Sequence, residues 1–432
     1  MAVLGFAVLA AAVLALLAVV HRYVWRRLVG DTTTAGSLPR RAGTAAAYVL
    51  PLLSVGALVS GRTGAPFRLQ QALAWPGYLW LAALLYLTLA LLAGEAVRPL
   101  LRRLLARRAA VSLEAAARAP ETAPAEPAAP AHPSALATAA PPAPAPTATA
   151  PRATAPAAPS RRLFVARAVG GAAAVAGLGT TGYGAYGVLR GPRVKRVTVP
   201  LARLPRSAHG FRIAVVSDIH LGPVLGSAHT RRIVDTVNRT QPDLIAVVGD
   251  LVDGSVADLG PAAEPLAGLH ARHGAFFVTG NHEYYSGAAE WVDHVRELGL
   301  HPLENARLEI DGFDLAGVND IAGESEGQGP DFGRALGDRD RTRAAVLMAH
   351  QPVVIDEAAR HGVDLQLSGH THGGQLWPGN YIAELSNPTV AGLERYGDTQ
   401  LYVTRGAGAW GPPVRVGAPS DVTVVELASR QA

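Results

Sequence analysis

The chain has 432 residues, and its hydrophobic content of 49% is high for a wholly water-soluble protein. It contains no cysteine, which excludes disulfides, thiolate nucleophiles and thiolate metal ligands, so a bound metal must use His, Asp, Glu or Asn. The net charge of +5 conceals a division, because residues 1–192 carry a balance of +13 and residues 193–432 a balance of −8. The basic charge therefore belongs to the first part of the chain and does not indicate a nucleic-acid-binding surface on the second.

Three uncharged apolar runs in the first hundred residues, at 2–20, 42–60 and 69–94, are long enough to cross a bilayer. The segments after the first and the third of these runs carry five arginines each, whereas the segment after the second run carries only two. By the positive-inside bias, this pattern predicts that the first and third segments are cytoplasmic and that the N-terminus lies outside. We therefore expect an all-α transmembrane region at residues 1–108.

Residues 109–160 consist largely of Ala, Pro and Thr. Such a segment has too few large apolar side chains to offset the loss of chain entropy on folding, and its prolines favour extended conformations. The composition predicts a disordered, semi-rigid cytoplasmic linker.

A fourth apolar run, residues 168–189, follows the sequence Ser160-Arg161-Arg162-Leu163-Phe164, which resembles a twin-arginine export signal. This export route carries folded proteins, which suits an enzyme that collects its metal in the cytoplasm. The alternative is an ordinary transmembrane anchor whose arginines only set the topology. No clear A-x-A cleavage site follows, so we expect residues 161–190 to remain as an anchor helix and the rest of the chain to lie outside the cell.

From residue 193 to 432, strand-like apolar runs alternate with amphipathic helical stretches, which predicts an α/β domain. Five of these strands run directly into a polar cluster. The clusters contain Asp218 and His220; Asp250 and Asp253; Asn281, His282 and Glu283; His350; and His370 and His372. Because ligands of open α/β sheets gather at the carboxyl ends of the strands, we expect these side chains to share one crevice.

The nitrogen and oxygen donors of these clusters are sufficient for two divalent ions, with one carboxylate bridging them. Two ions about 3.5–4 Å apart activate water and neutralise phosphoryl oxygens in many hydrolases. His370 and His372 are separated by one residue, and in an extended segment both imidazoles would point the same way, toward such a centre.

The ordered blocks DIH, GDLVD, GNHE, a single His, and GHTH resemble the calcineurin-like metallophosphoesterases over roughly residues 210–427. The longer stretches GNHEYY and GHTHGGQ are similar to the bacterial membrane-associated branch, which often carries a twin-arginine signal. The resemblance implies a four-layered αββα sandwich with a dinuclear metal centre at the strand ends. The resemblance implies that the metals would be two divalent ions such as Mn, Fe or Zn; the sequence does not fix their identity.

The resemblance also implies a role for each matched residue. Asp218, His220 and His372 would hold the first ion, Asp250 would bridge, and Asn281, His350 and His370 would complete the second. His282 would protonate the leaving oxygen and Asp253 would orient it. Gln375 and Trp377, directly after the HxH, either touch substrate or serve in packing. Glu283 is an accepted variant of its block, whereas Gly254, where phosphoprotein phosphatases have Arg, argues against that activity.

These features predict a membrane-anchored phosphohydrolase that cleaves phosphomonoester, phosphodiester or pyrophosphate bonds by attack of a metal-bridged hydroxide, on the extracytoplasmic face. Its substrate would be a phosphorylated small molecule, a lipid or a cell-envelope component, and a twin-arginine translocase is a possible partner. No nucleic acid is expected as a partner. The alternatives are a non-catalytic, metal-dependent binding or scaffold protein and an extracellular nuclease of the same superfamily.

Overall fold

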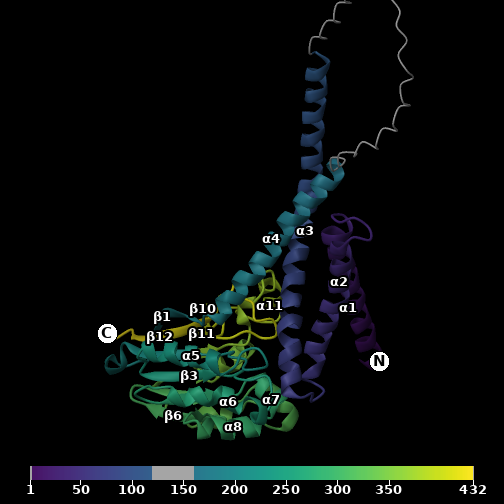
Figure 1. Ribbon diagram of the computed structural model, residues 1–432. Coiled ribbons are helices and arrows are strands. Elements are labelled where there is room, and N and C mark those ends of the chain that lie inside the picture. Colours follow the sequence, from purple (N-terminus) through teal and green to yellow (C-terminus); the bar gives the residue numbers. More distant parts are fainter. Residues whose placement is uncertain (1, 119–159, 432) are drawn as a thin grey trace, which may run out of the picture.

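The computed structural model describes residues 2–118 and 160–431 (Figure 1). Four long helices come first in the chain: α1 (Ala2–Trp25), α2 (Leu38–Ser60), α3 (Phe67–Ala117) and α4 (Arg161–Leu189). Among the described residues, α2, α3 over Phe67–Ser112, and α4 are long and apolar enough to span a membrane. The helix α1 covers the first predicted apolar run.

Helix α3 is much longer than its predicted membrane span, since it continues to Ala117. The expected end of the span at residue 94 and the expected start of the linker at 109 therefore both fall inside a helix. The physical reason is that Leu, Ala and Arg, which dominate this stretch, are strong helix formers even without an apolar environment. The remainder of the predicted linker, residues 119–159, lies outside the described residues.

The arginine-rich ends of the helices lie together at one end of the bundle (Figure 1). Arg27 and Arg98 both pair with Glu95, with their Nε atoms 2.9 and 3.6 Å from its Oε1. At the start of α4, the Arg167 side chain donates a hydrogen bond to the Thr32 carbonyl at 3.0 Å. The globular domain lies beside the opposite half of the bundle, where α2 connects to α3 (Figure 1).

The globular domain contains two six-stranded mixed sheets. In spatial order, the first consists of β1 (Arg193–Leu201), β12 (Asp421–Ser429), β2 (Phe211–Val216), β3 (Leu244–Val248), β4 (Ala275–Val278) and β5 (His301–Pro302). The second consists of β10 (Gly392–Tyr396), β11 (Thr399–Val403), β9 (Leu365–Ser368), β8 (Ala344–Met348), β7 (Phe313–Gly317) and β6 (Ala306–Ile310).

The largest apolar cluster lies between the two sheets, with Val215 and Val248 of the first sheet and Val346 and Leu367 of the second. A second cluster joins the outer face of the first sheet to α5 (Ser227–Arg239), α6 (Val256–Ala263) and α8 (Ala288–Glu297). A third joins the second sheet to α9 (Phe332–Leu336) and α10 (Ile355–Arg360). Strands buried on both faces explain the continuous apolar runs in the sequence. The predicted αββα sandwich behind an all-α region is confirmed.

Candidate metal centre

The five predicted polar clusters follow the carboxyl ends of β2, β3, β4, β8 and β9, and the structure brings them together. Their side chains form three overlapping groups in which the candidate ligand atoms lie within 4.8 Å of one another. The groups are Asp218, His220 and His372; His220, Asp250 and His282; and Asp250, His350 and His370.

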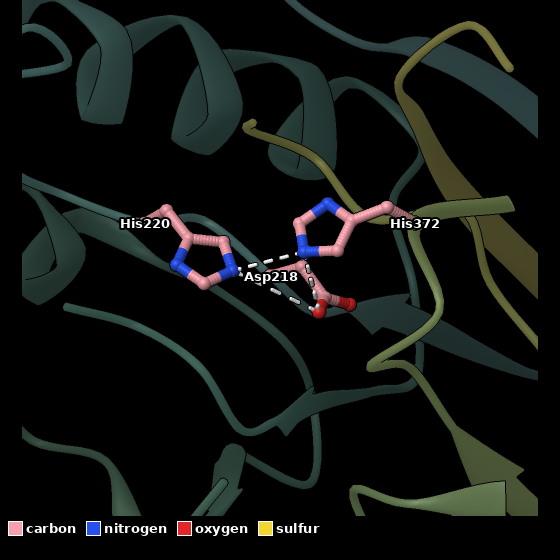
Figure 2. Close-up of side chains that lie close together, drawn as sticks. All are labelled: Asp218, His220 and His372. Atoms are coloured by element: carbon pink, nitrogen blue, oxygen red, sulfur yellow. Dashed lines mark hydrogen bonds and ion pairs between the residues drawn. The ribbon is translucent and has the colours of Figure 1, made fainter. Parts of the chain in front are cut away.

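The first group is buried and its donor atoms converge on one point (Figure 2). The Nε2 atoms of His220 and His372 are 3.0 Å apart, and Asp218 Oδ1 lies 3.4 Å from His372 Nε2 and 4.0 Å from His220 Nε2. Two imidazole nitrogens and one carboxylate oxygen around a common point form a donor set that suits a divalent cation.

In the third group, the orientation of His350 fits a metal ligand. Its Nδ1 donates to the Val248 carbonyl at 2.9 Å, so its Nε2 points toward Asp250 Oδ2, 3.1 Å away. This Nε2 is buried and has no hydrogen-bond partner among the described residues. A nitrogen lone pair facing a carboxylate is repelled, so a proton or a cation must lie between them. A backbone carbonyl that fixes the far nitrogen is the usual arrangement behind a ligating His.

Asp250 belongs to the second and third groups and lies beside His220 of the first. Its Oδ2 lies 3.6 Å from His220 Nε2 as well as 3.1 Å from His350 Nε2. Its Oδ1 accepts a hydrogen bond from the His282 backbone N–H at 2.9 Å. Although burial opposes ionisation, the surrounding imidazoles hold the pKa of Asp250 far below its usual range, so it is a carboxylate.

His370 completes the third group, and Asn281 lies beside it, with its Oδ1 3.1 Å from His370 Nδ1. Burial, assisted by the neighbouring His350, lowers the pKa of His370 to about 4. Burial and the neighbouring His220 likewise hold the pKa of His372 well below its ordinary value. Both rings are therefore neutral at pH 7, which is the form that binds metal ions.

His282 borders this cluster and reaches its exposed side. Asp253 Oδ1 lies 2.7 Å from His282 Nδ1 and 3.0 Å from His220 Nδ1. The His282 ring also packs against Tyr285 and Trp410, with ring centroids 5.4 and 5.7 Å away. The Asp253 carboxylate thus orients two imidazoles, that of His220 inside the cluster and that of His282 at its edge.

Five of the site residues have a left-handed backbone, with φ between 49° and 71°: Asp218, His220, Asp250, His370 and His372. Residues other than glycine rarely adopt this conformation, and each costs about 1–3 kcal/mol. The expectation of an extended HxH segment is therefore wrong. Both imidazoles still reach the centre because the chain turns sharply, and the His370 N–H is held by both oxygens of Asp218, at 3.0 and 3.1 Å.

Glu283 holds the ligand loops together, a function that the sequence analysis did not predict. It is buried and accepts hydrogen bonds from the backbone N–H groups of Gly280, Asp250 and Leu251 at 2.6, 3.0 and 2.7 Å. Glu283 lies in the first turn of α7 (Asn281–Ser286), three residues after Gly280, which is the spacing of a helix capping interaction. This spacing is the feature of the sequence from which the role of Glu283 could have been predicted.

Arg415 is a second residue that the sequence analysis missed. It is buried, and burial lowers its pKa to about 10. Its guanidinium donates to the His372 carbonyl and to His372 Nδ1, both at 3.0 Å, and to the carbonyls of Gly408 and Ala418 at 2.7 and 3.1 Å. Because a guanidinium only donates, Nδ1 accepts in this contact, so the neutral ring carries its proton on Nε2, which faces Asp218 and must lose that proton to bind a metal ion.

The two residues after the HxH occupy different environments. The Gln375 amide bonds to Trp410 on both sides, donating to its carbonyl at 2.9 Å and accepting from its N–H at 3.0 Å, so it holds a neighbouring loop. The Trp377 side chain is 49% exposed. A contact of either residue with substrate stays a prediction.

The fold and the cluster together define an α/β sandwich with a candidate metal centre at the ends of its strands. Residues 211–374 match the family described as calcineurin-like phosphoesterase. An uncharacterized metallophosphoesterase of Aquifex aeolicus is 35% identical over 240 residues, covering 54% of this chain and 91% of that relative. The chain therefore belongs to the calcineurin-like metallophosphoesterase family.

Two further relatives are longer than the shared domain. A "transmembrane protein with metallophosphoesterase domain" of Danio rerio is 38% identical over 259 residues, covering 57% of this chain and 59% of the relative. An uncharacterized metallophosphoesterase of Campylobacter jejuni is 37% identical over 246 residues, covering 56% and 65%. The chain thus spans less than two thirds of these relatives, and the description of the first agrees with the membrane-spanning candidates found here.

Proposed function

We propose that residues 193–432 form a dimetal phosphohydrolase that cleaves a phosphomonoester, phosphodiester or pyrophosphate bond. The observation that carries the proposal is the convergence of carboxylate and imidazole donors from several strand ends, which form three overlapping groups with ligand atoms within 4.8 Å of one another. Within them, His350 Nε2 lies 3.1 Å from Asp250 Oδ2, a pair of donors that a divalent ion would join.

The ligand assignments follow the first and third groups of side chains. Asp218, His220 and His372 would hold one ion, Asn281, His350 and His370 the other, and Asp250 lies between them. The mixed N/O set accepts Mn, Fe, Zn and similar divalent ions. Bound there, such ions supply charge neutralisation on phosphoryl oxygens and lower the pKa of bound water.

His282 would act as the general acid. Its Nδ1 bonds to Asp253 at 2.7 Å, so in the protonated ring Nε2–H is left to donate to a leaving oxygen. The Asp253 carboxylate stabilises the imidazolium and fixes the plane of the ring. The ring lies at the exposed side of the cluster, with 15% of its side chain accessible, where a leaving group can reach it.

The assay is hydrolysis of an aryl phosphate and a bis-aryl phosphate by the full chain with Mn²⁺ added, together with metal analysis. We expect two ions per chain, no activity in Asp250→Asn, and a loss of about 100-fold or more in His282→Ala. Asp293→Asn is a matched control, because this side chain is 75% exposed on α8. Activity that survives Asp250→Asn would refute the assignment.

The proposed orientation places the domain outside the cell. It is supported by the arginine-rich segments, which gather at one end of the bundle, while the domain lies beside the other half (Figure 1). Arg161 and Arg162 would direct export through the twin-arginine translocase before α4 anchors the domain. Replacing both with Lys should abolish protease accessibility of the domain in intact cells, whereas Arg167→Lys in the same helix should not. An Arg161→Lys/Arg162→Lys variant whose domain is still outside would exclude this route.

A further inference from the structure

Exposed apolar side chains gather on one edge of the globular domain. Ten large apolar side chains of residues 193–431 are exposed, and six of them lie in three segments: the helix α7, residues 377–385 and the loop at Trp410. These six form the set that we call the rim: Tyr285 (72% exposed), Trp377 (49%), Tyr381 (60%), Ile382 (71%), Leu385 (86%) and Trp410 (54%). Single exposed apolar residues are ordinary, but a contiguous group indicates a binding surface.

Two members of the rim, Tyr285 and Trp410, border the candidate metal centre. Tyr285 and Trp410 both pack against His282, the proposed general acid. Gln375 joins the Trp410 loop to the segment that carries Trp377, because its side-chain oxygen accepts from the Trp410 N–H at 3.0 Å. A substrate that reaches His282 from solvent therefore passes over these aromatic side chains.

The rim is also joined to the membrane-spanning helices. The Tyr86 hydroxyl of α3 donates to the Trp377 carbonyl at 3.1 Å. The Trp377 N–H donates to the Val416 carbonyl at 2.9 Å, and the adjacent Arg415 N–H donates to the Gly184 carbonyl of α4 at 3.3 Å. Figure 1 shows α7, with Tyr285, and α11 (Asn380–Ala383), with Tyr381 and Ile382, on the edge of the domain that faces α3.

The short connection between α4 and the globular domain limits how far the domain can move relative to the helices. Only residues 190–192 separate the end of α4 at Leu189 from the start of β1 at Arg193. Tyr86 lies 19 residues beyond Phe67, about 28 Å along α3, so the Trp377 segment of the rim lies against the flank of that helix, inside its apolar span. Lipid around that span would lie next to this part of the rim.

We propose that the rim inserts into the lipid leaflet and that the substrate is a lipid whose phosphate group lies at the leaflet surface. The inference rests on the phosphohydrolase function proposed above. Trp and Tyr side chains favour the region of the lipid headgroups, and Ile382 and Leu385 supply the apolar contact with acyl chains. A water-soluble phosphate gains nothing from such a rim, whereas a lipid phosphate is held by it beside His282.

The position of the rim can be measured without catalysis. Because the chain has no cysteine, Leu385→Cys provides a single site for an environment-sensitive fluorophore. In the full chain, reconstituted in nanodiscs of phosphatidylcholine and phosphatidylglycerol, we expect a blue-shifted emission that brominated lipids quench. The matched control is Leu308→Cys on β6, 41% exposed and outside the rim, where no quenching is expected. A label at 385 that stays in water, or that is shielded without being quenched by lipid, would overturn the proposal; the second result would indicate a protein partner.

Substrate choice can be tested with one scissile bond and two chain lengths. An aryl phosphate that carries a hexadecyl chain and its methyl counterpart are compared in the same nanodiscs. The ratio of their hydrolysis rates should fall at least about tenfold in Ile382→Ser/Leu385→Ser, since two apolar side chains lose their burial in lipid. Leu308→Ser/Val353→Ser, which removes two apolar side chains exposed elsewhere, should leave the ratio unchanged.

The two proposals fail in different ways. If wild-type protein with Mn²⁺ hydrolyses neither substrate and no other aryl phosphate, the phosphohydrolase function is refuted. If it hydrolyses both with a ratio that the rim substitutions do not change, only the lipid inference is refuted.

Discussion

The Asp253→Asn substitution tests the proposed catalytic arrangement through one oxygen atom. Asp253 Oδ1 contacts Nδ1 of both His282 and His220. Burial raises the pKa of Asp253, but the two imidazoles outweigh it and lower the pKa from 3.8 to about 2. That difference corresponds to about 2 kcal/mol after an allowance for partial solvent screening, because 23% of the side chain is exposed.

An asparagine at this position keeps the size of the side chain and removes its charge. The imidazolium of His282 would lose its stabilising partner in the transition state, where it donates its proton. Because His220 contributes first to that pKa difference and His282 second, the part that concerns His282 is about 1 kcal/mol, and its loss lowers kcat about fivefold. Because Asp253 lies behind the ring, kcat and kcat/KM should fall together, as expected for an interaction made in the transition state.

The assay is steady-state hydrolysis of an aryl phosphate at saturating Mn²⁺, with the bound metal measured in the same samples. Asp293→Asn controls for the chemistry of the substitution on an exposed part of α8. A kcat within about twofold of wild type at full metal occupancy would refute the orienting role of Asp253. If activity falls only in proportion to the bound metal, we would conclude that Asp253 acts mainly by positioning the metal ligand His220.

Three other perturbations have defined outcomes. Mn²⁺ at 100 times its Kd should stabilise the domain by about 3 kcal/mol in thermal unfolding, and Asp250→Asn should abolish that shift. Burial, with Arg232 and Arg415, lowers the pKa of His229 to about 4, so only the unfolded chain takes up its proton below pH 6.5. Stability should fall by up to about 3 kcal/mol as pH drops from 6.5 to 4, and denaturant titration of His229→Leu should show a shallower fall. Arg415→Met should cost about 3–5 kcal/mol by the same titration, since it leaves the buried carbonyls that Arg415 bonds without their donor; a cost below about 1 kcal/mol would contradict this.

The residues of the site could be predicted from the sequence because they directly follow apolar strands, which are recognisable from short stretches of sequence. Asp218 and His220 follow β2, and Asp250 follows the adjacent parallel strand β3. Parallel strands deliver their carboxyl ends to the same edge, so the convergence follows from topology alone. The backbone conformation did not follow, because hydrogen bonds across the site, such as that of the His370 N–H to Asp218, force the turn.

The residues that the sequence did not reveal act across long separations. Arg415 lies 43 residues from His372, and no sequence pattern between them predicts that the two side chains contact each other. The rim is assembled from α7, the segment 377–385 and the loop at Trp410, none of which has a helical or strand period to mark it. Similarly, hydropathy locates the apolar part of α3 but not its end, since a charged helix continues beyond any membrane boundary.

The buried charges of the site explain why metal and fold should be acquired together. Asp218 is fully buried, and burial, with the added repulsion of Asp250, raises its pKa, so two adjacent carboxylates in this environment are costly without compensation. Imidazoles offset that cost only when protonated, yet a ligand imidazole must be neutral. A divalent cation satisfies both conditions at once, because it neutralises the carboxylates and accepts the free nitrogen lone pairs. A chain that reaches this state before export selects its metal in the cytoplasm, which is the physical advantage of a folded-protein export route for a site of this kind.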